Sequence, residues 1–233
     1  MNSRLKRWGY EFIQSAVLAI PFAFQIHTAA HKARSFLKVW HYLSTNKIYG
    51  DYLEFGVFEG RGFKLALKSA RKMFKSKTFY PRFFAFDSFQ GLPSIDKTKD
   101  APNVFYEKTL VCSEETFLKR VHKSSRNEKM YTVPGYFSES LTASVRDKFD
   151  IRFAAFVNID CDLYDSALTA LRFVGPSLKT GSVIYFDDWF LSGGDMRRGE
   201  AGACAQWCKE NPDISLHDFG DIGFPGKLFI VNR

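Results

Sequence analysis

The chain has 233 residues and a mass of 26.8 kDa, which suits one α/β domain with a helical extension rather than two full domains. Hydrophobic residues make up 45% and charged residues 25%, so a disordered chain is excluded. The net charge of +8 excludes an acidic solvating tail and leaves room for an anionic partner. Four cysteines are too few for a disulfide framework, so we expect a reducing, cytoplasmic location.

The first 48 residues predict helices, because apolar residues recur there without alternation. An uncharged stretch over residues 12–24 follows Arg4, Lys6 and Arg7, as in a signal peptide, but it is too short to span a bilayer and Pro21 interrupts it. We interpret residues 1–48 as a buried helical extension that forms a lid over the site. Peripheral membrane contact through this segment stays open.

From residue 49 to 233 the pattern is that of an α/β domain. Short apolar runs at residues 52–55, 83–86, 130–133, 153–159 and 182–186 are separated by helical stretches, which indicates parallel strands buried on both faces. Two further runs, at 214–219 and 227–231, have no helix between them and predict an antiparallel hairpin at the sheet edge. The predicted fold is therefore a mostly parallel seven-stranded sheet with helices on both faces.

The first strand ends in a glycine-rich turn that leads into a helix. Gly56, Gly60 and Gly62 would let the backbone approach a ligand closely, although a turn required only for packing is the alternative. Glu54 at the strand end and Glu59 in the turn would repel the pyrophosphate of a dinucleotide. They suit a cationic ligand instead, so the charges favour S-adenosylmethionine over NAD.

The ends of the second and third strands predict a nucleoside site. Asp87 follows the second strand, where a carboxylate can accept both ribose hydroxyls, although it could instead cap a turn. The third strand leads into residues 135–138, a loop whose aromatic and hydroxyl groups could cover an adenine.

Two acidic pairs follow the fourth and fifth strands: Asp160 with Asp162, and Asp187 with Asp188. The carboxyl ends of neighbouring parallel strands meet at one edge of the sheet, so these side chains should converge. Four carboxylates in one place need protons or a cation, and oxygen-only ligands suit Mg²⁺. Such an ion would stabilise the alkoxide of a substrate alcohol while a neighbouring carboxylate takes the proton. Helix caps and turn residues explain one of the acids, but not both pairs.

Four motifs in this order resemble the macrocin O-methyltransferase family. They are EFGVFEG at 54–60, FDSFQGLP at 86–93, DCDLYDS at 160–166 and the Asp187-Asp188 pair. The resemblance implies a Rossmann-like class I methyltransferase that uses S-adenosylmethionine and Mg²⁺ to methylate a hydroxyl of a sugar or glycosylated small molecule. It implies metal ligands at Asp160, Asp162, Asp187 and Asp188, with Asp162 and Asp160 as the catalytic residues. The implied cofactor contacts are Glu54, Gly56, Val57, Gly60, Arg61, Asp87, Ser88, Gly135, Tyr136, Phe137, Ser138 and Asp160.

The chain departs from the family pattern at Arg61, which could meet the cofactor carboxylate or point to solvent, and at Trp189, where the family more often has Tyr. Residues 89–111 have no clear periodicity and predict a mobile lid. Two other functions stay open: an RNA methyltransferase, suggested by the net charge and a basic helix face after the first strand, and a non-catalytic, membrane-associated scaffold. We expect a small-molecule acceptor, no nucleic acid partner, and a homo-oligomer.

Overall fold

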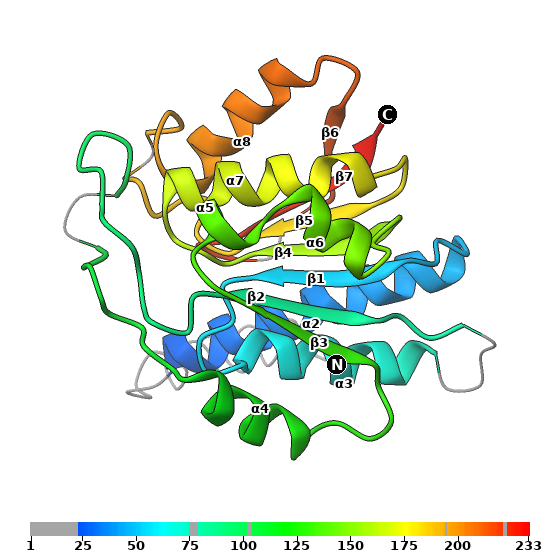
Figure 1. Cartoon of the computed structure of the whole chain (residues 1–233). Helices are drawn as coiled ribbons and strands as arrows, with labels where there is room; N and C mark the ends of the chain where they lie inside the picture. Colours follow the sequence, from blue (N-terminus) through cyan, green and yellow to red (C-terminus); the bar gives the residue numbers. More distant parts are fainter. Residues whose placement is uncertain (1–22, 75–78, 102–103, 194, 221–222) are drawn as a thin grey trace, which may run out of the picture.

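The computed structural model describes residues 23–74, 79–101, 104–193, 195–220 and 223–233. These residues form one sheet of seven strands in the order β3-β2-β1-β4-β5-β7-β6 (Figure 1). The strands are β1 (Asp51–Phe55), β2 (Phe83–Asp87), β3 (Met130–Pro134), β4 (Ala154–Ile159), β5 (Val183–Phe186), β6 (Ser215–Asp218) and β7 (Lys227–Asn232).

The topology confirms the predicted fold class. β1 pairs in parallel with β2 and β4, and the parallel ladder continues to β3 on one side and to β5 on the other. β7 runs antiparallel to β5 and also pairs with β6, which forms the edge. The strand order reverses between β1 and β4, and ligands of open α/β sheets bind outside the carboxyl ends of the strands at such a switch point.

Helices cover both faces of the sheet (Figure 1). α2 (Ala23–Thr45), α3 (Arg61–Met73) and α4 (Glu114–His122) lie on one face; α5 (Phe137–Ser140), α6 (Ala143–Lys148), α7 (Tyr164–Val174), the 3₁₀ turn η1 (Gly175–Ser177) and α8 (Gly199–Glu210) lie on the other. The apolar stripe that the sequence places on α3 is buried at Phe63, Ala66, Leu67 and Ala70. α4 begins after Ser113, whose side chain accepts a hydrogen bond from the Thr116 N–H and so caps the helix.

α2 is part of the core of the α/β domain. Its residues Phe36, Val39, Trp40 and Leu43 follow a helical spacing and are at most 1% exposed. The Phe36 and Trp40 rings lie 5.2 Å and 5.4 Å from the ring of Phe156 in β4. One face of α2 is thus buried against the sheet, at the positions from Phe36 to Leu43.

The rest of the N-terminal expectation falls mainly outside the described residues. Residues 1–22, which include most of the uncharged stretch, are not described, so lid and membrane roles for them stay predictions. Among the helices that are described, none combines the length and apolar character needed to cross a membrane.

Candidate active site

A cavity of about 450 Å³ opens at the carboxyl ends of β1, β2, β4 and β5. Twelve of the predicted site residues line it: Glu54, Gly56, Val57, Arg61, Asp87, Ser88, Tyr136, Phe137, Ser138, Asp160, Asp162 and Asp187. The other three, Gly60, Gly135 and Asp188, are not among its lining residues but adjoin them in the sequence. Four motifs that are far apart in the chain therefore meet in one place.

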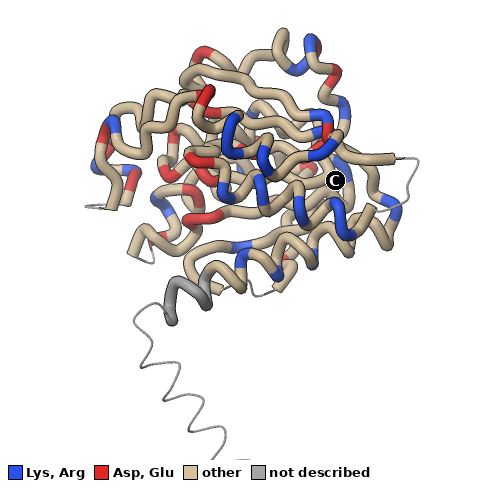
Figure 2. Tube along the Cα trace, turned by 90° about the horizontal axis from the view of Figure 1, so that it is seen from below, with Lys and Arg blue, Asp and Glu red and all other residues tan. Residues whose placement is uncertain are grey.

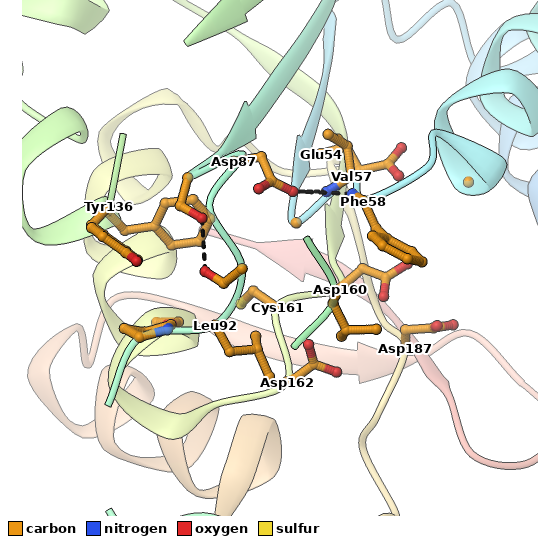
Figure 3. Close-up of a pocket in the computed structure, with 18 of the residues that line it drawn as sticks. Glu54, Val57, Phe58, Asp87, Leu92, Tyr136, Asp160, Cys161, Asp162 and Asp187 are labelled. Atoms are coloured by element: carbon orange, nitrogen blue, oxygen red, sulfur yellow. Dashed lines mark hydrogen bonds between the residues drawn. The ribbon is translucent and has the colours of Figure 1, made fainter. Parts of the chain in front are cut away.

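The cavity has two chemically different ends: Figure 3 shows Asp87 and Val57 in its upper half and Asp160, Asp162 and Asp187 in its lower half. The nucleoside end consists of the glycine turn after β1, Asp87 and residues 135–138; the acidic end consists of Asp160, Asp162, Asp187 and Asp188. In Figure 2, acidic positions gather toward the left of the view, where the strands end, while many Lys and Arg lie across the middle and right.

Close packing within the chain explains two glycines of the turn. Gly56 has a φ of +85°, and a Cβ there would overlap the backbone carbonyl of Asp160, so only glycine lets the end of β1 lie against the end of β4. A Cβ on Gly62 would lie 2.6 Å from a carboxylate oxygen of Glu54. The packing alternative thus accounts for these two glycines, although both also line the cavity.

Asp87 is held by backbone N–H groups (Figure 3). Its Oδ2 accepts hydrogen bonds from Val57 N at 2.8 Å and Phe58 N at 3.0 Å, and its Oδ1 accepts one from Phe89 N at 2.7 Å. The carboxylate thus joins the tip of β2 to the turn after β1, which is the capping role left open by the sequence. A carboxylate offers about four lone-pair positions, so one acceptor position remains for a hydroxyl.

Glu54 forms a buried part of the cavity wall. Its side chain is 1% exposed and accepts a hydrogen bond from the Tyr52 hydroxyl. Burial, with the charge of Asp160 added, raises the pKa of Glu54 to about 8. A ligand ammonium group beside it would favour the charged carboxylate.

The charge of Glu59 is largely neutralised in the structure. Its carboxylate pairs with Arg120 at 2.7 Å and with Arg61 at 3.4 Å. Glu59 would therefore repel a pyrophosphate less than the sequence suggested, and the raised pKa of Glu54 weakens its repulsion as well. The Arg61 side chain is 85% exposed, which fits the solvent-facing alternative.

The segment after β2 also contributes to the cavity. Gly91, Leu92, Pro93, Ser94 and Leu110 line it, so the described part of residues 89–111 lies over the site as predicted. The mobility of this segment stays a prediction. Part of the segment is hydrogen-bonded to the first residues of α7 and α8. Asp100 accepts a hydrogen bond from Tyr164 N at 2.8 Å, and Lys99 O accepts one from Gly199 N at 2.7 Å.

At the acidic end, strand alternation directs Asp160 and Asp187 to the same face. Side chains two residues apart on a strand point the same way, so Asp160 follows Phe156 of β4 and Asp187 follows Tyr185 of β5 toward α2. There they meet a residue that the sequence analysis did not predict: Lys32 Nζ lies 3.0 Å from Asp160 Oδ2 and 2.8 Å from Asp187 Oδ2.

These charges shift one another's pKa values. Burial would lower the pKa of Lys32, but Asp160 and Asp187 raise it well above its ordinary value, so the ammonium is charged. Burial would raise the pKa of Asp187, but Lys32 and the Tyr185 hydroxyl, which donates to Oδ1 at 2.6 Å, lower it. Burial and the charge of Asp187 raise the pKa of Asp160 to about 8.

Asp188 faces away from Lys32 and pairs with Asp162. Burial and the charge of Asp162 raise the pKa of Asp188 well above its ordinary value. Burial raises the pKa of Asp162 to about 7. Its φ of 68° is unusual for a residue other than glycine, and such backbone conformations cluster at functional sites.

Glu200 of α8 ties the two acidic segments together. Its carboxylate is 1% exposed and accepts hydrogen bonds from Cys161 N at 3.3 Å and Asp188 N at 3.0 Å. One carboxylate thus holds the backbone after β4 against the backbone after β5. The sequence analysis missed it because Glu200 lies in no acidic motif.

The expected magnesium site does not form in this arrangement. Within the described residue ranges, no group of three or more His, Cys, Asp or Glu side chains is placed to hold a metal ion. Two of the four aspartates share the Lys32 ammonium, so the donor set as it is arranged does not fit a divalent cation.

The sequence did contain a signal for Lys32. It lies one helical turn before Phe36, on the same stripe as Phe36, Val39 and Leu43, and a lysine on a buried stripe needs a charged partner. The motifs of residues 54–188 say nothing about this helix, so the partner could not be named.

Comparison with known proteins places the chain in a family. The sequence profile of macrocin-O-methyltransferase (TylF) matches residues 23–200, which is more than half of the chain. The chain belongs to the macrocin O-methyltransferase family. The match begins at the first described residue of α2, so the family's domain includes the helix that carries Lys32.

The chain is similar in sequence to a curated protein, demethyldecarbamoylnovobiocin O-methyltransferase of Streptomyces niveus. It is 26% identical over 157 residues, which are 63% of this chain and 55% of the relative. The chain thus spans little more than half the length of this curated relative.

Solved structures of methyltransferases share the fold. The O-methyltransferase NovP superposes with a TM-score of 0.67 and 20% identity, covering 87% of this chain and 80% of NovP. CalS11, titled a calicheamicin methyltransferase, gives 0.64 and 14% identity over 99% of this chain and 94% of its own. An apo structure of CalS11, named there as a TDP-rhamnose 3'-O-methyltransferase, superposes with a TM-score of 0.58 and 16% identity. The match covers 99% of this chain and 96% of that chain. At these identities the similarity shows the fold alone.

Proposed function

We propose that the chain is an S-adenosylmethionine-dependent O-methyltransferase that acts on a hydroxyl of a sugar or glycosylated small molecule. The observation that carries this proposal is the single cavity in which the glycine turn, Asp87, residues 136–138 and three aspartates meet. Membership of the macrocin O-methyltransferase family supports the reaction class.

The nucleoside end suits S-adenosylmethionine by its charge. The buried Glu54 offers an acidic partner for the amino group of the ligand, and Asp87 offers an acceptor for a ribose hydroxyl. Tyr136 and Phe137 supply ring faces for the adenine. The other proposed contacts follow the same wall: Val57, Ser88 and Ser138 from the lining, with Gly60 and Gly135 shaping their loops.

The acidic end supplies the groups that an acceptor hydroxyl needs. When bound, the methyl donor supplies an electrophilic carbon on a sulfonium. The acceptor oxygen forms a bond to that carbon, the carbon–sulfur bond breaks with its electron pair going to sulfur, and the hydroxyl proton goes to a carboxylate. Asp162 is the proposed base and Asp160 orients the acceptor, since both line the cavity.

A sugar acceptor is proposed from the relatives. The titles of the curated relative and of CalS11 name demethyldecarbamoylnovobiocin and TDP-rhamnose as their substrates. A sugar hydroxyl requires hydrogen-bond acceptors around it, and the acidic end provides carboxylates.

The test is calorimetric titration of the full chain with S-adenosylmethionine and with its demethylated product, followed by transfer of a labelled methyl group to a panel of nucleotide deoxysugars and glycosylated aromatics. We expect binding in the micromolar range and transfer to at least one sugar hydroxyl. Absence of binding at millimolar ligand contradicts the proposal.

The two other candidate functions gain no support. Lys68, Arg71, Lys72 and Arg126 border a separate groove that shares no lining residue with the cavity, and of the basic residues of α3 the cavity lining includes Arg61. Arg71 is committed to an ion pair with Glu128. The scaffold hypothesis depends on residues 1–22, which are not described. The homo-oligomer and the cytoplasmic location stay predictions.

A further inference from the structure

We propose that the ammonium group of Lys32 is the built-in cation of the acidic end: it takes the place of a divalent metal ion between Asp160 and Asp187 and donates a hydrogen bond to the acceptor oxygen. This inference rests on the proposed methyltransferase function. It concerns which cation that function uses.

The first support is the position of the ammonium. Lys32 Nζ lies 3.0 Å from one carboxylate oxygen of Asp160 and 2.8 Å from one of Asp187, so it bridges the ends of β4 and β5. A magnesium ion bridging the same two side chains would lie about 2.0–2.1 Å from each oxygen. Both cations would need the same space, and the lysine must leave before a metal ion can enter.

The second support is that the protein holds Lys32 in place. Phe36, one turn further along α2, is 0% exposed, and its ring lies 5.6 Å from that of Tyr185. The Tyr185 hydroxyl in turn donates to Asp187, and Lys32 Nζ lies 5.7 Å from the Tyr185 ring. The Lys32 side chain thus starts from a packed helix rather than from a loop.

An ammonium can also take part in the reaction. It carries three N–H donors, two of which point to Asp160 and Asp187, and Lys32 lines the cavity. The third donor can meet the acceptor oxygen and stabilise the negative charge that develops as the hydroxyl proton leaves, which is the electrostatic role of a metal ion.

The decisive experiment measures manganese binding and methyl transfer on the same proteins. Mn²⁺ binding is followed by electron paramagnetic resonance in the presence of the demethylated cofactor, which does not require turnover. Methyl transfer is measured after removal of metal ions, with and without EDTA. The proteins are the wild type, Lys32→Met, which keeps length and removes charge, and Lys68→Met, an exposed control on α3.

We expect the wild type and Lys68→Met to bind no Mn²⁺ at micromolar concentrations and to keep their activity in EDTA within about twofold. Lys32→Met should lose about 100-fold in methyl transfer, and it should acquire an Mn²⁺ site because two carboxylates are left without their cation.

Stoichiometric Mn²⁺ binding by the wild type, or loss of its activity in EDTA with recovery in Mg²⁺, overturns the inference. If the wild type transfers no methyl group under any condition, the proposed function fails, and Mn²⁺ binding still decides the role of Lys32. Should Lys32→Met fail to fold, the wild-type measurements alone decide it.

Discussion

At the nucleoside end Asp87 is fixed by three backbone N–H groups, whereas at the acidic end Asp160 and Asp187 share one lysine ammonium. Backbone donors are set by the fold and do not titrate. Side-chain donors can be exchanged for those of a ligand. The difference indicates a nucleoside end formed before the ligand binds and an acidic end whose charges rearrange around the reacting groups.

Gly56 joins the two ends, and its substitution should have the largest effect. A Cβ there would overlap the carbonyl of Asp160, and its φ of +85° disfavours other residues. We expect Gly56→Ala to lower the free energy of unfolding by about 3 kcal/mol, from overpacking and backbone strain together. Urea denaturation measures it.

Gly193→Ala is the matched control for Gly56→Ala. Its φ is +62°, but a Cβ there would meet nothing within 4 Å. Only the backbone strain remains, so we expect Gly193→Ala to lower the free energy of unfolding by about 1 kcal/mol. Equal losses in the two variants would show that the two strands do not need this close approach.

The acidic end should govern turnover. Asp162→Asn removes the proposed base, and asparagine tolerates the φ of 68° at this position. We expect kcat to fall by about 100-fold while the affinity for S-adenosylmethionine stays nearly constant. Steady-state kinetics with Asp147→Asn, an exposed position on α6, provides the control. A loss of cofactor affinity with unchanged kcat would show that Asp162 binds the cofactor and does not act as the base.

The nucleoside end should govern affinity. In Asp87→Asn one of the oxygens that accept backbone N–H groups becomes an amide donor, and the negative charge is lost. We expect the Kd for the demethylated cofactor to rise about 10-fold, the equivalent of one charge-assisted hydrogen bond. Calorimetry on Glu139→Gln, an exposed position of α5, controls for charge alone. An unchanged Kd would mean that Asp87 only caps the turn.

The same difference explains which parts the sequence could predict. The strands and the glycine turn are local patterns of apolar runs and turn residues, and each predicted strand appears within about two residues of its expected position. Asp87 could be placed at the site because it directly follows the second predicted strand, which lies beside the first. Lys32 could not, because it lies 128 residues from Asp160 and its role depends on how α2 packs on the sheet.

The four-aspartate magnesium site illustrates the same limit. The sequence shows that four acids follow two adjacent strands, and it correctly requires protons or a cation for them. It does not show that alternation along the chain turns Asp187 toward α2 and Asp188 toward Asp162. The sequence therefore predicted Mg²⁺ at a place where the structure has the Lys32 ammonium.

Glu54 lies beside both ends, and its substitution should change the pH dependence of stability. Its pKa is about 8 in the folded protein, above the 4.5 of the free side chain, so the folded state binds the extra proton. The stability from this proton is fully present below about pH 4.5 and is lost as the pH rises through about 8. Asp160 and Asp162 titrate in the same window, so Glu54→Gln should reduce this decline rather than abolish it. Urea denaturation of the ligand-free protein between pH 5 and about 8.5 measures the slope. If the variant has the same slope as the wild type, the pH dependence comes from Asp160 and Asp162 alone. Glu54 would then already be charged in the ligand-free protein.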